Sequence, residues 1–383
     1  MSHIVPSLAE VFAAIPDPRH AQGRRHPLVA ILLLACVAML AGARGQSGIA
    51  DWAKHYGEPW RTRLGFTHPK GPSQSTLQRV FAQIAIETLE MQLACWAQQV
   101  FVALPAPAAD AGETTQLDGV ALDGKTMRMS ARCGAVDAHL LSMCSHRLGI
   151  VLAQMAVSDK TNEAAASDDL LAALMLTGVV ITGDAMFAHQ DIAQTILDGE
   201  NDYLLIVKEN QPTLLAEIAL LFADPEAAVT TGEAVDAHSQ RLERRRLSAS
   251  PELAGVTGWP GLAQVLRMER RVIDLPTGEV RDETAYAITS LSAAQATPLH
   301  LLTLWRQHWH IENKLHWVRD VTFGEDGSTV RAGRGPQLLA TLRNTAIGLL
   351  RRNGATNIAA ACRRYAAQPA LALAAVGLSP ENE

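Results

Sequence analysis

The chain has few cysteines and no extended apolar run of the length that spans a bilayer. Its five cysteines are odd in number and scattered, and no two of them are spaced as C-x-x-C. This pattern argues against a disulfide framework and against a zinc site, and it predicts reduced, mostly buried thiols in a cytoplasmic protein. No internal repeat is visible, so a solenoid is excluded. The length of 383 residues and the hydrophobic content of 48% predict one large folded core or two smaller ones.

The most apolar segment covers residues 28–43 and is shorter than the roughly 20 residues that span a bilayer. It follows Arg24 and Arg25 and ends in an A-x-A-like triplet, as a signal peptide does. The region before it is long and contains Glu10 and Asp17, which a signal peptide would not. The segment is therefore predicted to be a buried core helix, and no membrane association is expected.

The formal net charge of −6 argues against a nucleic-acid partner, but the charge is unevenly distributed. Residues 1–100 carry nine basic and six acidic side chains, and residues 301–383 carry ten and six. The remaining fourteen basic and twenty-seven acidic side chains lie in residues 101–300. Basic ends around an acidic middle fit DNA contacts at the ends and a metal-binding centre.

Residues 1–104 are predicted to form an all-helical accessory domain. Ser7 and Glu10 have the spacing of a capping box, and further helices are expected at 28–41, from Ser75 onward and at 87–103. One hypothesis is a DNA-binding domain whose exposed Gln74, Gln78 and Arg79 enter the major groove. The equally weighted alternative is a packing domain that covers one face of a catalytic sheet. Residues 105–112 are predicted to be a linker.

Residues 113–352 are predicted to form an α/β domain. Three short β-like runs at 117–123, 138–144 and 149–157 precede a helix, the strand 179–182, a second helix and the strand 203–207. This order is that of an RNase H-like core. A β-rich insertion is expected at about 225–290, and a C-terminal helical tail at 353–383.

A long helix is predicted from about residue 293 or 298 to residue 319. At about 3.6 residues per turn, one helical face carries Trp305, His308, Glu312, either Leu315 or His316, and Arg319, with Glu312 at its centre. A zinc site of His308, Glu312 and His316 fits this spacing, but no H-E-x-x-H motif is present and zinc is not favoured.

Two acids end apolar, β-branched runs. Asp123 follows V-A-L, and Asp184 follows V-V-I-T-G; Asp118, in a second L-D-G, is a near-duplicate of Asp123. Two strand-borne aspartates and the helix-borne Glu312 are what a two-metal phosphodiester site requires, since Mg²⁺ prefers carboxylate oxygens.

Three blocks carry a resemblance to a known family. A-L-D-G-K-T-M-R, T-G-D-A-M-F-A-H-Q with D-Y-L-L-I-V-K-E-N-Q-P-T-L, and R-Q-H-W-H-I-E-N-K-L-H-W-V-R-D-V-T-F-G-E-D resemble the catalytic blocks of DDE insertion-sequence transposases. The branch that includes the H-repeat-associated proteins is the most similar. The amino-terminal I-P-D-P-R-H and G-R-R-H-P-L also resemble that branch's accessory domain.

The resemblance implies an RNase H-like fold with a β-rich insertion, DNA strand cleavage and strand transfer. It assigns Asp123, Asp184 and Glu312 as the catalytic and metal-binding residues. Two Mg²⁺ ions are expected, with Mn²⁺ as a possible substitute. The implied partner is double-stranded DNA, both transposon ends and target, bound by a homo-oligomer.

The wider hairpin-forming transposases have tyrosine, arginine and lysine where this chain has Trp305, His308 and Arg319. The resemblance therefore leaves open whether a hairpin intermediate forms. His308 and Arg319 are still candidates for DNA contacts because of their basic character. Further candidates, which could instead cap and solvate the surface, are Lys125, Lys208, Asn210 and Gln211, together with Arg241, Arg244, Arg245 and Arg246 in the insertion.

Two other functions are weighed against a DNA transposase. A catalytically inactive or domesticated DNA-binding protein derived from a transposase would bind DNA without nicking it, although the intact triad argues against it. A phosphatase with Asp123 as nucleophile would need a second aspartate at position 125, which is Lys125.

Overall fold

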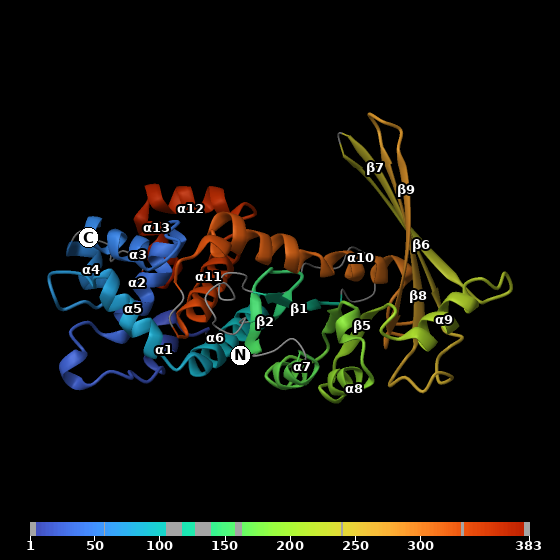
Figure 1. The fold of residues 1–383 in the computed structure, drawn as a ribbon, viewed down its shortest axis with the longest axis horizontal. Helices are drawn as coiled ribbons and strands as arrows, with labels where there is room; N and C mark the ends of the chain where they lie inside the picture. Colours follow the sequence, from blue (N-terminus) through green and yellow to red (C-terminus); the bar gives the residue numbers. More distant parts are fainter. Residues whose placement is uncertain are drawn as a thin grey trace. The chain divides into compact units, whose positions relative to one another are not determined.

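The computed structural model describes residues 5–56, 58–104, 117–126, 139–157, 163–238, 240–330 and 333–378. The fold is mixed α/β, with nine strands hydrogen-bonded in the order β3-β2-β1-β4-β5-β9-β8-β7-β6 (Figure 1). The chain divides into two compact units. Unit 1 joins Met1–Pro105, Gly124–Glu163 and Ile311–Glu383, and unit 2 joins Ala106–Asp123 and Ala164–His310. One boundary directly follows Asp123, and another lies two residues before Glu312.

Helices make up the described amino-terminal part of unit 1. They are α1 (Leu8–Ala13), α2 (Leu28–Leu40), α3 (Gln46–His55), α4 (Glu58–Arg63), α5 (Gln74–Gln83) and α6 (Ile86–Ala103), with a short 3₁₀ turn at Ala21–Gly23. The predicted capping box is confirmed, because the Glu10 N–H donates to Ser7 Oγ at 3.3 Å and the Ser7 N–H donates to Glu10 Oε2 at 2.7 Å. Such a pair satisfies two amides that would otherwise lack partners at the helix start.

The apolar helix α2 lies at the centre of unit 1. Twelve of its thirteen residues are buried, and it packs against α1 and α3 and against α11 (Gly335–Arg352), α12 (Ile358–Ala367) and α13 (Pro369–Ala375). Among the described residues, only the segment containing α2, Ala21–Leu40, is long and apolar enough to cross a membrane. Its burial inside the unit confirms the prediction of a core helix.

Unit 1 also contains the hairpin of β2 (His139–Ser145) and β3 (Val151–Val157). The two strands are antiparallel, and α6 packs against β3. The side chain of Gln98 on α6 donates to the carbonyl of Leu152 at 3.3 Å, which fixes the helix on the strand.

The core of unit 2 is a parallel arrangement of three strands. In it β4 (Val180–Gly183) lies beside β1 (Gly119–Thr126) and β5 (Asp202–Val207), with α7 (Glu163–Ala172) and α8 (Gln190–Asp198) as connections. Parallel neighbours need such crossovers. The predicted alternation of strand and helix is present.

Four further strands form a ribbon that extends the sheet of unit 2. They are β6 (Thr230–His238), β7 (Arg241–Ser250), β8 (Gln264–Asp274) and β9 (Val280–Thr289), all antiparallel, and β9 pairs with β5. Figure 1 shows the far ends of these strands projecting beyond the helices of unit 2. The strands lie between Asp184 and Glu312, where the sequence predicts a β-rich insertion. The helix α9 (Pro212–Leu221) precedes them.

Helix α10 (Pro298–His308) lies on this sheet because one of its faces is apolar. Leu301, Leu302, Leu304 and Trp305 are buried in one cluster with Leu247, Leu266 and other strand residues. Each fully buried side chain of this kind contributes about 1.5–3 kcal/mol. Trp305 is thus a core residue of unit 2.

The chain is helical over nearly all of the predicted range to residue 319, but the regular α-helical spacing assumed for it does not hold. The α-helix α10 ends at His308, and two π-helical segments follow, Glu312–His316 and Val318–Thr322. The N–H of Trp317 donates to the carbonyl of Glu312, and that of Phe323 to Val318, so each bond spans five residues instead of four. Side chains after residue 311 therefore depart from the face that regular 3.6-residue spacing assigns to them.

Candidate active site

Asp123 and Asp184 lie at corresponding places on adjacent parallel strands. Leu122 of β1 pairs with Gly183 of β4, and each aspartate is the next residue along its strand. Neighbouring strands are about 4.8 Å apart, so the two backbones present their acids side by side. Asp184 directly follows the carboxyl end of β4, whereas Asp123 lies within β1, which continues to Thr126. Asp118 lies at the opposite, amino-terminal end of β1, where its carbonyl accepts from the Val180 N–H. The register thus separates Asp123 from its near-duplicate.

The turn after β4 fixes the carboxylate of Asp184. This side chain accepts a hydrogen bond from the Ala185 N–H at 2.8 Å and caps the 3₁₀ turn Ala185–Phe187. Glycine precedes it because a Cβ at Gly183 would come within 3.0 Å of Leu205 and 3.1 Å of Phe187. The close approach of strand and turn therefore requires position 183 to lack a side chain.

A lysine faces Asp184. The ammonium of Lys208, just after β5, donates to Asp184 Oδ1 at 3.0 Å and to Oδ2 at 3.4 Å. Burial by itself would raise the pKa of Asp184, but the Ala185 N–H, Lys208 and His308 together hold that pKa below its ordinary value. Asp184 is therefore ionised at neutral pH, as a metal ligand must be.

Asn210 and Gln211 hold the turn that follows Asp184. The Asn210 amide donates to the carbonyl of Ala185 at 2.7 Å, and the Gln211 amide donates to that of Ala188 at 2.9 Å. Both side chains stabilise the loop through these bonds. Of the two roles the sequence leaves open, this arrangement supports the structural one.

His308 reaches the same strand from α10. It is buried, and its Nδ1 lies 3.0 Å from Thr182 Oγ1, two residues before Asp184. A buried imidazole in this place supports the strand end from one side. The zinc alternative for His308, Glu312 and His316, which the sequence did not favour, depended on regular helical spacing, and π-helical hydrogen bonds replace that spacing from Glu312 onward.

Glu312 begins the first π-helical segment of unit 1. The Glu312 side chain is 58% exposed, and its Oε2 lies 3.0 Å from Nδ1 of the buried His316. Single-turn π-helices often occur at functional sites because the extra residue redirects side chains. Carboxylate and imidazole are both metal-ligand types, so this pair adds His316 to the candidates, a residue that the sequence tied only to zinc.

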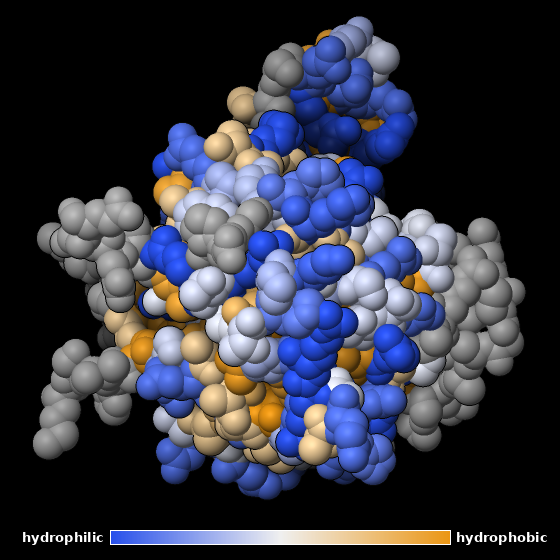
Figure 2. All heavy atoms as spheres, turned by 90° about the vertical axis from the view of Figure 1, so that its left-hand side faces the viewer, coloured by the Kyte–Doolittle hydropathy of each residue, from blue (hydrophilic) through white to orange (hydrophobic). Residues whose placement is uncertain are grey.

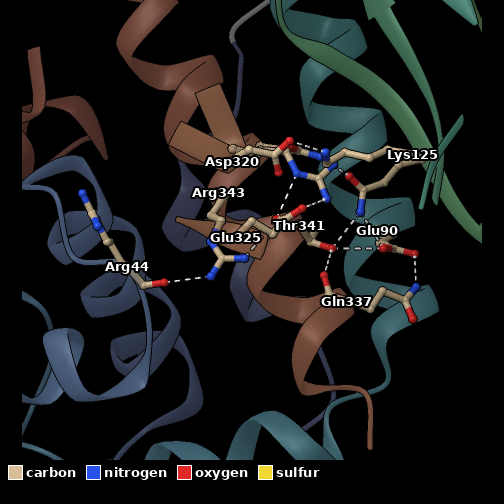
Figure 3. Close-up of polar contacts among 11 residues, drawn as sticks. Arg44, Glu90, Lys125, Asp320, Glu325, Gln337, Thr341 and Arg343 are labelled. Carbon is tan, nitrogen blue, oxygen red and sulfur yellow. Dashed lines mark hydrogen bonds and ion pairs between the residues drawn. The ribbon is translucent and has the colours of Figure 1, made fainter. Parts of the chain in front are cut away.

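Lys125 is held by an acid from its own unit. Its ammonium donates to Asp320 Oδ2 at 2.6 Å, and both side chains are partly buried (Figure 3). On the same strand, Thr126 Oγ1 lies 3.0 Å from Nδ1 of His139 in β2. The Gly124 backbone approaches this imidazole so closely that a Cβ at position 124 would overlap His139 Nε2.

Arg319 is not placed to contact DNA, contrary to the prediction. Its guanidinium is fully buried and donates to both carboxylate oxygens of Glu325, at 3.0 and 2.6 Å. Arg343 of α11 also donates to Glu325, at 2.9 Å, and to the backbone carbonyl of Arg44 at 2.8 Å (Figure 3). Glu325 lies in the motif V-T-F-G-E-D, which is part of the third block that resembles the transposases. The spacing of this motif does not indicate that Arg319 and Arg343 are its partners.

The arginines of the insertion are largely neutralised within the ribbon. Arg244 pairs with Glu233 at 2.6 Å, and Arg245 pairs with Asp236 and Glu243, each at 2.7 Å. Because β6 supplies Glu233 and Asp236 and β7 itself supplies Glu243 beside these two arginines, the ribbon offers less net positive charge there than its sequence implies.

Two family models match the chain. The one described as "Transposase DDE domain" matches residues 114–349, and the one described as "DDE_Tnp_1-associated" matches residues 9–97.

Curated relatives match most of the chain. The H repeat-associated putative transposase YhhI of Escherichia coli K12 is 32% identical over 362 residues, which cover 90% of each chain. The putative protein YbfL of the same organism is 32% identical, again over 90% of each chain. An uncharacterized protein in the dhlA 3′ region of Xanthobacter autotrophicus is 33% identical over 76% of this chain and 96% of its own.

Similarity to solved structures is at a low level. The piggyBac transposase in a synaptic complex with hairpin DNA, solved by cryo-EM, is 10% identical with a TM-score of 0.43, covering 100% of this chain and 80% of that one. A likeness of this size carries no argument about fold or partner.

Proposed function

The chain belongs to the DDE transposase family and is a DNA transposase, and we propose that Asp123, Asp184 and Glu312 are its catalytic carboxylates. The observation that carries the proposal is the pairing of Leu122 with Gly183, which sets Asp123 and Asp184 side by side on adjacent parallel strands. The ionised state of Asp184 and the exposed position of Glu312 at the start of a π-helical turn support it.

The family implies dependence on a divalent metal, and we assign the metal to these three carboxylates, with His316 as a further candidate ligand. The residues fit such a group, because hard ions such as Mg²⁺ prefer carboxylate oxygens. The ammonium of Lys208 beside both oxygens of Asp184 supports this assignment, because it places a positive charge at the carboxylate that would hold the metal. We propose two Mg²⁺ ions, replaceable by Mn²⁺, which would supply charge stabilisation for phosphoryl transfer.

We also propose that the catalytic core is RNase H-like. The succession of β1, β2, β3, α7, β4, α8 and β5, with β4 parallel to both β1 and β5, supports this assignment. Asp123 within β1 and Asp184 directly after β4 lie at neighbouring register positions of these two parallel strands. The helices of residues 8–103 would then be the accessory domain.

The proposed chemistry has two steps at phosphorus. A water oxygen bonds to the phosphorus at the element end, the bond from that phosphorus to the 3′ oxygen breaks, and the water's proton reaches the leaving oxygen through solvent. The 3′-hydroxyl released then attacks a target phosphorus and displaces the target's 3′ oxygen. Asn210 and Gln211 keep the turn after Asp184 in place throughout, and Lys208 supplies positive charge next to the reacting phosphate.

The proposed partners are double-stranded DNA at the element ends and at the target, bound by more than one copy of this chain. The competing function is DNA binding without catalysis. The triad that the chain retains favours the enzyme.

Nicking of a duplex that carries the DNA flanking this gene tests the proposal. Wild type, Asp184→Asn and Glu312→Gln are compared in Mg²⁺, with Asp191→Asn, an exposed acid of α8, as the matched control. Loss of nicking by at least about 100-fold in the two triad variants alone is expected, since even outer-shell partners of a metal contribute 10–100-fold. Wild type that binds these ends and never cuts them would support the binding protein instead.

A further inference from the structure

Helix α5 presents a polar face that contains no acid. Its buried side is formed by Leu77, Val80 and Phe81, whereas Gln74, Gln78 and Arg79 are exposed. Gln74 and Gln78 are one turn apart, so they point the same way with a spacing of about 6 Å along the axis. Side chains of this kind can make paired hydrogen bonds with base edges, glutamine with adenine and arginine with guanine.

A basic cluster lies next to the start of this helix. The exposed Arg25 contacts the ring of His68, and His68 Nδ1 accepts from the Lys70 N–H at 3.1 Å. Lys70 is itself exposed and precedes Gln74 by four residues, so their Cα atoms are within about 14 Å. Between residues 58 and 83 the sequence has four lysines and arginines and a single acid.

The segment that joins cluster and helix is fixed in place. Pro72 is buried, and a Cβ at Gly71 would come within 2.9 Å of the Ala53 Cβ on α3. Ser73 caps α5 by accepting from the Thr76 N–H at 3.3 Å, and α5 packs against α3. The helix and the cluster are therefore presented as one preformed surface. Figure 2 looks onto the side that carries α3 and α4, where hydrophilic and hydrophobic residues are both exposed.

We propose that α5 enters the major groove of duplex DNA and reads the ends of the element through Gln74, Gln78 and Arg79, while Arg25 and Lys70 bind phosphates. The proposal rests on the transposase function, because it names the surface by which that function finds its substrate. A duplex fits better than an acidic peptide, since the two glutamines offer both donors and acceptors instead of charge. Phosphate contacts position such a helix, and base contacts give it specificity.

Fluorescence anisotropy of the full chain tests the proposal, with two labelled duplexes, one carrying the DNA that flanks this gene and one of scrambled sequence. The double variant Gln74→Ala, Gln78→Ala is expected to lose its preference for the flanking sequence by about tenfold or more. The matched control is Gln190→Ala, Gln194→Ala, two exposed glutamines with the same spacing on α8 of unit 2. Thermal melting confirms that each variant folds.

The double variant Arg25→Ala, Lys70→Ala tests the phosphate contacts. It is expected to weaken binding of both duplexes equally and to reduce the slope of log affinity against log salt by about one for each cation removed. Unchanged preference in the α5 variant, or binding that neither double variant alters, would overturn the proposal.

Failure of this surface is distinguishable from failure of the proposed enzyme. If the α5 variants bind DNA like wild type and their nicking still depends on Asp184, the proposal for the α5 surface is refuted and the catalytic assignment stands. If the α5 variants lose binding and wild type does not nick the DNA, the α5 surface is supported and the catalytic assignment is refuted.

Discussion

The ammonium of Lys208 lies 3.0 Å from Asp184 Oδ1, and both side chains are about half exposed, at 53% and 45%. An exposed ion pair contributes little, about 0–1 kcal/mol, because water competes for both charges. If Asp184 holds the proposed divalent cation, Lys208 would give up this ion pair at small cost. Its ammonium would then be available to a bound phosphate.

Replacing Lys208 by methionine is expected to separate these two effects. Without the competing ammonium, nicking should reach half its maximal rate at a lower Mg²⁺ concentration. The maximal rate should fall about 100-fold, because charge next to the reacting phosphate is lost. A Mg²⁺ titration of the nicking rate measures both quantities, with Lys54→Met, an exposed lysine of α3, as control. Identical curves for Lys208→Met and wild type would show that the pair is incidental.

Gly124→Ala is expected to disturb the strand that carries Asp123. The added Cβ overlaps the buried His139 imidazole, which Thr126 holds in place, so β1 must shift. Overpacking of this kind costs about 1–3 kcal/mol. The free energy of unfolding, measured in urea, and the nicking rate should both be lower than in wild type.

The control for this strand is Gly327→Ala, where nothing lies within 4 Å of the added Cβ and the backbone is not in the left-handed region. Equal stability of the two alanine variants would contradict the close contact at Gly124.

The positions of Asp123 and Asp184 could be predicted from sequence because each acid follows a short apolar, β-branched run. Such runs are local signals, and the ends of parallel strands meet at one sheet edge. The capping box of Ser7 and Glu10 was predictable for the same reason, since its two partners are three residues apart.

The surroundings of Glu312 could not be predicted in this way. A π-helical turn adds one residue to the hydrogen-bonded ring and has no distinctive composition. The 3.6-residue spacing therefore assigned the side chains after residue 311 to the wrong face. Glu312 is exposed, whereas Arg319, assigned to the same face, is fully buried. The partners of Arg319 and Lys125 come from packing of distant segments, which periodicity does not report.

Glu90 of α6 is expected to make stability depend on pH. It is buried and accepts from Gln154 at 2.7 Å, Gln337 at 3.0 Å and Thr341 at 3.0 Å, none of which carries a charge (Figure 3). Burial raises the pKa of Glu90, and these donors offset only part of that rise. The folded state thus holds the proton more tightly than the unfolded state, so stability is greatest below the unfolded pKa and falls as pH rises through the folded one.

Glu90→Gln should remove this loss. The free energy of unfolding, measured in urea between about pH 5 and pH 8, should decline less in the variant than in wild type. Glu217→Gln, an exposed acid of α9, should decline as wild type does. A steeper decline in Glu90→Gln than in wild type would reverse the sign and refute the assignment.

Glu325 should be the most sensitive acid of unit 1, because two buried guanidiniums depend on it. It accepts from Arg319 and Arg343, and Arg343 in turn holds the backbone of Arg44. Removing one member of a buried ionic cluster costs about 3–5 kcal/mol, since the remaining charges lose their partner in a medium that solvates them poorly. Glu325→Gln is therefore expected to lower the free energy of unfolding by that amount at pH 7.

The same carboxylate contributes to stability in acid. Burial opposes its ionisation, but Arg319 and Arg343 outweigh burial and hold the pKa of Glu325 below its ordinary value. Its contribution is present above the unfolded pKa of about 4.3 and is lost as pH falls through the lower folded value. Glu325→Gln should unfold with a flatter dependence on pH in that range, and Asp326→Asn, the neighbouring acid, should follow wild type.

A third variant distinguishes charge compensation from packing at this cluster. Replacing Arg319 and Arg343 by methionine and Glu325 by leucine leaves no charge to compensate, and such replacements are often neutral or stabilising. The triple variant is expected to recover most of the stability that Glu325→Gln loses. Stability is measured by urea unfolding at pH 7. If the triple variant is as unstable as Glu325→Gln, the geometry of the cluster stabilises this part of unit 1, and its charge balance does not.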